Sequence, residues 1–100
     1  MSSERAETRT PDGRRVVFDH ISREHLAARR PWLLDHVDAI LIALARPDLH
    51  VADPIPGRER FYRRHIDGKR WLRVVVDFDG DHGWVVTAVV QDNPPREPPL

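Results

Sequence analysis

The sequence contains no cysteine, and this absence excludes several classes of protein at once. A chain without thiols has no disulfide framework, no iron–sulfur cluster, no cysteine-based zinc site and no thiol nucleophile. Long apolar runs are also missing, because the longest, residues 39–45, is far shorter than the roughly 20 residues of a membrane span. No apolar stretch follows the N-terminal residues, so no signal peptide is visible. We therefore expect a cytoplasmic protein without a membrane partner.

The chain also lacks net charge, since 16 Lys and Arg residues balance 16 Asp and Glu residues. A neutral total argues against nucleic-acid binding, because such proteins usually carry a basic surface. The charges are unevenly placed, however. Residues 58–73 contain seven basic and two acidic side chains (+5), whereas residues 32–57 and 74–100 carry −3 and −4. All basic residues but one are Arg, which suits bidentate phosphate binding, although the codon bias of a GC-rich genome explains the same excess.

The chain length predicts a single domain. Residues 1–13 are polar, lack periodicity and end in a Pro-Asp-Gly turn signal, so we expect a disordered arm before a domain at residues 14–92. Residues 93–100 are too rich in proline to pair in a sheet and predict an extended tail. The spacing of Pro95 and Pro98 also fits a PxxP recognition segment, with a solvated tail as the simpler interpretation.

Two helices are predicted between residues 20 and 47. Ser22 can cap the first, residues 23–30 contain good helix formers, and Pro31 ends it. Pro31 also suits the first turn of a second helix, which has one apolar stripe and stops before Pro47. The residues of this stripe are Leu33, Val37, Ile40, Leu41 and Leu44.

Aromatic and β-branched residues indicate three consecutive strands after the helices, at residues 60–66, 70–78 and 84–90. An Asp-Gly pair between the first two is the strongest short hairpin signal. Residues 14–18 and 49–52 can add short strands. We therefore predict an α+β fold in which the N-terminal helical segment packs on one face of a three- to four-stranded antiparallel meander. The other face of the sheet would be open and available for a functional site.

The basic hairpin at residues 60–73 is the first candidate site. Side chains alternate along a strand, so Arg63 and His65 share one face while Tyr62 and Arg64 share the other. The second strand adds one arginine to each face, so either face presents cations and an aromatic ring. This pattern fits phosphate binding with base stacking, and a solvated polar hairpin is the alternative. The candidate RNA-binding residues are Arg60, Arg64, Arg70 and Arg73.

Thr87 and His20 are candidates outside the hairpin. Thr87 is the only hydroxyl in an apolar strand, where it either fills an exposed position or holds a phosphate oxygen. His20 precedes the first helix, where an imidazole serves as an acid or base or has a structural role. His20 and His25 are not spaced for joint metal binding on a helix, and no cysteine is present. We therefore predict no metal site and no cofactor.

The order of these motifs resembles the barnase–EndoU–colicin–RelE-like fold, and more narrowly its phage- and toxin-associated branches. The resemblance covers about residues 16–92. It implies a metal-independent endoribonuclease, commonly the toxin of a conflict or toxin–antitoxin system, whose partners are RNA and an antitoxin or immunity protein. Close members often have a His where this chain has Arg30. The motifs are His20-Ile21, Arg30-Pro31, Arg46-Pro47-Asp48, Arg60-Phe61-Tyr62-Arg63, Leu72-Arg73-Val74-Val75-Val76 and Val85-Val86-Thr87-Ala88.

RNA cleavage without a metal ion needs a base for the 2′-hydroxyl, an acid for the leaving 5′-oxygen, and cations for the phosphorane. The resemblance assigns a proton-transfer role to His20, and the alternation of the strand makes His65 a second acid–base candidate. Arg63 (or Arg64, on the other face) would stabilise the developing charge. A catalytically inactive RNA- or protein-binding module of the same fold is the alternative function. The candidate catalytic residues, which should converge in one cleft on the open face, are His20, Arg63, Tyr62, Thr87 and His65.

Overall fold

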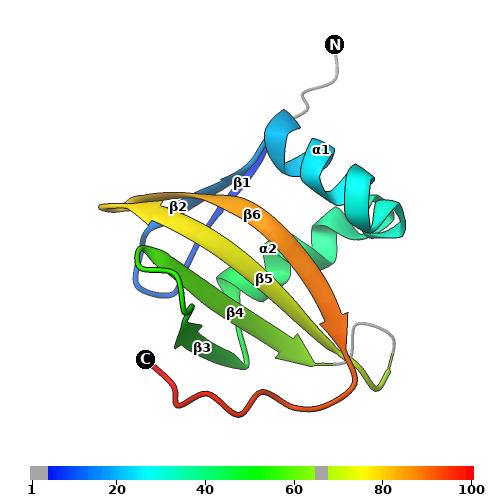
Figure 1. Cartoon of the computed structure of the whole chain (residues 1–100). Helices are drawn as coiled ribbons and strands as arrows, with labels where there is room; N and C mark the ends of the chain where they lie inside the picture. Colours follow the sequence, from blue (N-terminus) through cyan, green and yellow to red (C-terminus); the bar gives the residue numbers. More distant parts are fainter. Residues whose placement is uncertain (1–4, 65–67) are drawn as a thin grey trace.

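A mixed β-sheet with helices packed against it forms the fold (Figure 1). The computed structural model describes residues 5–64 and 68–100, and within these ranges the sheet has six strands. The α+β class predicted from the sequence is therefore confirmed, whereas the predicted size of the sheet is wrong. In chain order the elements are β1 (Ala6–Arg9), β2 (Arg15–Phe18), α1 (His20–Arg29), the 3₁₀ helix η1 (Pro31–His36), α2 (Val37–Ala45), β3 (Leu49–Ala52), β4 (Arg58–Arg64), β5 (Trp71–Asp79) and β6 (His82–Gln91).

The strands lie in the order β1-β2-β6-β5-β4-β3. Strands β4 to β6 form the antiparallel meander that the sequence predicts, and β3, which the sequence left optional, extends it by pairing antiparallel with β4. Strand β2 instead pairs in parallel with β6, so the expectation of a purely antiparallel sheet is wrong. Three helical segments and three strands separate β2 from β6 along the chain. Local sequence patterns do not predict such a distant pairing. The backbone groups of a strand can bond to any neighbouring strand, so the pattern of β2 does not identify its partner.

The expected disordered arm at residues 1–13 contains a strand. Residues Ala6–Arg9 form β1, an edge strand that pairs antiparallel with β2. A tight turn joins the two strands, because the Thr10 amide donates to the Arg14 carbonyl and the Gly13 amide donates to the Thr10 carbonyl, each at 2.9 Å. Short polar edge strands carry a weak sequence signal, since only one of their two sides is covered.

The predicted helices exist, with different ends. Asp19 rather than Ser22 is the N-cap of α1, and the two side chains form a reciprocal capping box. The Ser22 hydroxyl also donates a 2.7 Å hydrogen bond to the Val85 carbonyl, which fixes α1 beside β6. The second predicted helix is divided: residues Pro31–His36 take the tighter 3₁₀ form of η1 before α2 begins.

The helices leave the two faces of the sheet unequal. Helix α2 covers one face and contacts β4 and β5. Helix α1 lies along the part of β6 that β2 does not reach, because β2 pairs only with residues 82–84 (Figure 1). The face opposite α2 is called the open face below. The core between α2 and the sheet includes Phe18, Leu26, Ile40, Leu44, Phe61, Leu72, Val74, Val76 and Val85.

No helix within the described residues is long and apolar enough to cross the hydrocarbon core of a membrane.

Candidate nucleic-acid interface

The strand registers arrange the side chains of the open face in rows. Arg58 of β4, Asp77 of β5 and Trp84 of β6 lie opposite one another in the first row. A bulge between Val75 and Val76 shifts the register, so that the next row contains Thr87 rather than Val86. The following rows are Arg60–Val75–Thr87, Tyr62–Arg73–Val89 and Arg64–Trp71–Gln91.

A groove lies between α1 and the open face, and we call it the α1 groove. One hollow in it has a volume of about 190 Å³, and an adjoining hollow of about 330 Å³ shares His25, Arg58 and Val86 with the first. Asp77 and Trp84 also line the first hollow, whereas two further arginines and the Thr87 hydroxyl line the second. The other lining residues are Ile21 and Val85 in the first hollow, and Arg29, Arg30, Thr87 and Val89 in the second.

The periodicity of α1 explains how its polar residues reach the groove. Ile21, His25 and Arg29 are spaced by four residues and therefore share one side of the helix. Ser22 and Leu26, one position later, are buried and hold the helix against the rest of the protein. Packing of the buried side thus turns the imidazole of His25 and the guanidinium of Arg29 toward the sheet.

Several polar groups of the α1 groove have no partner in the part of the chain that the structure describes. Among the described residues, His25, Arg29 and Arg30 form no salt bridge within 4.0 Å. The Thr87 hydroxyl is buried and has no hydrogen-bond partner within residues 5–64 and 68–100, and the same is true of Nε of Arg73 in the neighbouring row. Buried donors normally find a partner, so these groups mark a place where a polar ligand would be bound favourably.

The sheet separates the predicted catalytic residues. Thr87 and Tyr62 lie on the open face, as their registers with Val75 and Arg73 show. Arg63 alternates to the face covered by α2, where its side chain donates a 2.5 Å hydrogen bond to the carbonyl of Arg46 just after that helix. The prediction that Arg63 converges with Thr87 on the open face is therefore wrong, because a strand presents neighbouring side chains on opposite faces.

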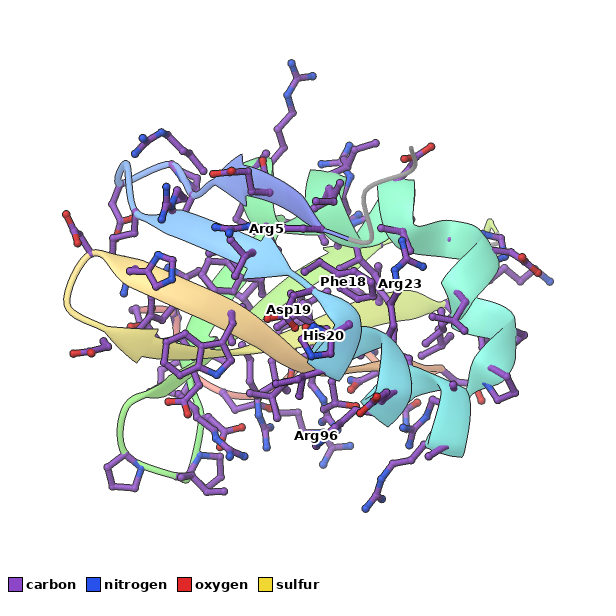
Figure 2. All side chains as sticks on the ribbon, turned by 90° about the horizontal axis from the view of Figure 1, so that it is seen from above. Arg5, Phe18, Asp19, His20, Arg23 and Arg96 are labelled. Atoms are coloured by element: carbon purple, nitrogen blue, oxygen red, sulfur yellow. The ribbon has the colours of Figure 1, made fainter. Side chains whose placement is uncertain are left out.

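His20 is exposed at the first position of α1, beside Asp19 (Figure 2). Although burial opposes the effect, hydrogen bonds from the backbone of Ser22 and Ile21 lower the pKa of Asp19, and His20 contributes to the same shift. His20 does not line either hollow of the α1 groove. His65, the second acid–base candidate, lies outside the described residues.

The four predicted RNA-binding arginines occupy different environments. Arg60, Arg64 and Arg73 lie on the open face, where the Arg64 guanidinium is 5.0 Å from the ring centre of Trp71. Arg70 instead lies 5.9 Å from the ring centre of Trp32 in η1. Three of the four arginines therefore share the face that contains Thr87.

Tyr62 and Arg60 contact the C-terminal tail. The Tyr62 hydroxyl donates a 2.6 Å hydrogen bond to the Glu97 carboxylate, and Nη1 of Arg60 lies 3.4 Å from the same oxygen. Burial and the Glu97 carboxylate both raise the pKa of Tyr62, which outweighs the opposite effect of Arg73 and Arg60. Tyr62 is thus a protonated hydrogen-bond donor near neutral pH.

Several residues of the α1 groove are absent from the sequence-based candidates. The four-residue spacing of His25 and Arg29 was a usable signal, but it required knowing which side of α1 is buried. Asp77 and Trp84 join Arg58 only through the registers of three strands. Among the described residues, no group of three His, Asp or Glu side chains is placed to hold a metal ion.

These features define an α+β protein with a partly basic groove on one sheet face. The chain matches no protein-family model, and the searches of curated proteins and of solved structures find no similar protein.

Proposed function

We propose that the α1 groove binds single-stranded RNA and cleaves its phosphodiester bonds without a metal ion. One observation carries this proposal: His25, Asp77 and Arg58 line the same hollow. An imidazole, a carboxylate and a guanidinium can supply the acid, the base and the cation that metal-free transesterification of RNA requires. Trp84 also lines this hollow and is 36% exposed, so its ring is available for stacking against a base.

The proposed reaction is an attack of the 2′-hydroxyl on the adjacent phosphorus. The Asp77 carboxylate takes the 2′-hydroxyl proton, and the oxygen forms the new bond to phosphorus. Protonated His25 donates its proton to the 5′-oxygen as the bond from phosphorus to that oxygen breaks. Arg58 and Arg29 offset the negative charge that develops on the phosphorane. The products are a 2′,3′-cyclic phosphate and a free 5′-hydroxyl.

The proposal retains the endoribonuclease function of the resemblance, with His25 in place of His20 as the imidazole that transfers a proton. Membership of the barnase–EndoU–colicin–RelE-like fold is part of the same proposal, and the motif order described above supports it. A toxin of this type would be neutralised by an antitoxin or immunity protein, and a partner with an acidic surface would suit the basic wall formed by Arg29 and Arg30.

The test is an RNA cleavage assay in the presence of EDTA. DNA of the same sequence is the control substrate, because it lacks the 2′-hydroxyl. We expect the wild-type protein to release 2′,3′-cyclic phosphate ends from RNA only. His25→Ala and Asp77→Asn should each lower the rate by about 100-fold or more. His20→Ala is the matched control, since it removes an exposed imidazole from the same helix, and we expect near-normal cleavage.

Two results would contradict the proposal. Cleavage that depends on His20 and not on His25 would move the reaction out of the α1 groove. Binding of RNA without cleavage, at high protein concentration, would instead favour a catalytically inactive RNA-binding module.

A further inference from the structure

The C-terminal tail, residues 93–100, places a carboxylate among the cations of the open face. Glu97 is held by Tyr62 and Arg60, as described above. The Leu100 amide donates a 2.8 Å hydrogen bond to the His50 carbonyl in β3, so the end of the tail is also fastened (Figure 1). The tail therefore lies against the β3–β4 side of the sheet at two defined points.

The groups around Glu97 form a built anion site. Tyr62 is 1% exposed, and the side chain of Arg60 is 19% exposed. Asp53 accepts a 2.7 Å hydrogen bond from Nε of Arg60, which orients the guanidinium while Nη1 faces Glu97. A rigid phenol and an oriented guanidinium are donors suited to phosphate oxygens as well as to a carboxylate.

Arg73 adds a further cation beside this site. The register places Arg73 directly opposite Tyr62 on the open face. Its Nε is buried and has no hydrogen-bond partner among the described residues, so Glu97 does not satisfy all the donors present. A group with more acceptor oxygens than one carboxylate, such as a phosphate, would satisfy more of them.

The anion site and the α1 groove belong to one surface. Arg60 lies in the same row as Thr87, and it follows Arg58 by two residues on the same side of β4. A nucleic-acid strand that leaves the α1 groove across β4 therefore meets the position that the Glu97 carboxylate now occupies.

We propose that Arg60, Tyr62 and Arg73 form a second phosphate subsite, which Glu97 occupies as an internal competitor until an RNA strand displaces the tail. The proposal rests on the RNA-binding function of the α1 groove. The tail then lowers the affinity for RNA, since the carboxylate must leave the subsite before a phosphate enters.

The test compares the full-length protein with Glu97→Gln and with Asp92→Asn. Asp92 is the matched control because it is exposed and lies just before the tail, and because Asp92→Asn removes the same charge as Glu97→Gln. The probe is a fluorescent 2′-O-methyl RNA strand, which cannot be cleaved. We expect Glu97→Gln to bind about tenfold more tightly, because a charged hydrogen bond no longer competes. Asp92→Asn should change the affinity less than twofold, and adding Arg73→Gln to Glu97→Gln should abolish the gain.

A second measurement follows the tail itself. Hydrogen exchange at the Leu100 amide should become faster when the wild-type protein is saturated with the probe, because the bond to His50 is lost. An amide that stays protected in the complex would overturn the proposal. Equal gains in Glu97→Gln and Asp92→Asn would also overturn it, since only overall charge would then matter.

A comparison of Glu97→Gln with Arg29→Gln tests this subsite independently of the α1 groove. If Glu97→Gln strengthens binding while Arg29→Gln has no effect, the subsite is supported and the proposed groove is wrong. If Arg29→Gln weakens binding while Glu97→Gln behaves like Asp92→Asn, the groove is supported and the internal competitor is wrong. If no RNA binds, inorganic polyphosphate is the second probe, and failure of Glu97→Gln to bind it more tightly than wild type overturns the subsite.

Discussion

Arg14 and Glu59, 45 residues apart, are joined by two side-chain hydrogen bonds of 2.7 and 2.8 Å. Nε2 of His50 lies 2.5 Å from one oxygen of the same carboxylate, and the Arg14 guanidinium lies 3.8 Å from the ring centre of Phe78. The Arg14 and Glu59 side chains are only 19% and 21% exposed. This bidentate pair joins the turn between β1 and β2 to β4, which contains Glu59. It therefore stabilises the position of the unexpected N-terminal hairpin.

Removing either partner of this pair should destabilise the protein. Arg14→Met and Glu59→Gln should each lower the free energy of unfolding by about 2 kcal/mol, because the remaining charge stays partly buried with fewer partners. Urea unfolding measures the loss, and the double mutant should lose less than the sum, with a coupling of about 1 kcal/mol. Asp79→Asn, at an exposed position of β5, is the control. Strictly additive losses would show that the two residues act independently.

Glu59 should also contribute to the acid sensitivity of the fold. Hydrogen bonding from Arg14, which outweighs burial, and from His50 lowers the pKa of Glu59 below its ordinary value of 4.5. The unfolded chain regains the ordinary value, so this stabilisation is complete above pH 4.5 and is lost as the pH falls through the lower folded pKa. Urea midpoints measured across this range should therefore fall less steeply for Glu59→Gln than for wild type. Parallel profiles would contradict the assignment.

Gly83 should not tolerate even one additional carbon atom. A Cβ at this position would lie 2.7 Å from Cδ1 of Phe78 and 2.8 Å from Cγ1 of Val76. The Arg14 guanidinium lies over the Phe78 ring, so the ring is packed from that side as well. Gly83→Ala should lower the free energy of unfolding by about 1–3 kcal/mol, as overpacking typically does. Adding Phe78→Leu should recover part of the loss, and a substitution without effect would show that the ring moves freely.

Thr87→Val should separate stability from binding. The buried Thr87 hydroxyl has no partner in the described ranges of the chain, so replacing it with a methyl group should raise the free energy of unfolding by up to about 1 kcal/mol. The same change should weaken RNA binding several-fold, because a donor to phosphate is removed from the α1 groove. Thermal unfolding and fluorescence titration measure the two effects. A less stable variant would show that the hydroxyl serves the fold instead.

The salt dependence of RNA binding should report phosphate contacts in the α1 groove. Each phosphate contact on a single strand contributes about 0.7 to the slope of log K against log salt concentration. Arg29→Gln should therefore weaken binding and reduce that slope by about 0.7. Arg70→Gln is the comparison, since Arg70 lies beside Trp32 rather than in the groove. We expect Arg70→Gln to keep the slope, and an equal reduction in both variants would indicate diffuse attraction.

Parts of the site were predictable because they depend on alternation along single strands. The period of two correctly places Tyr62 and Arg64 on the face opposite Arg63. The choice of which face is open was not predictable, since both contain arginine and only packing of α2 decides between them. His25 was missed for a related reason: its position in the α1 groove depends on the burial of Ser22 and Leu26 on the adjacent side of the helix.

The sequence by itself determined the features whose signals are local: the meander from β4 to β6, the apolar stripe of α2 and the neutral but uneven charge. Turn residues and side-chain periodicity specify these features within a few residues of chain. Only the tertiary structure decided that β2 pairs in parallel with β6, that α1 lies beside the open face, and that Glu97 reaches Tyr62. Each of these contacts joins groups far apart in sequence, and its free energy depends on the packing of the whole domain rather than on neighbouring residues.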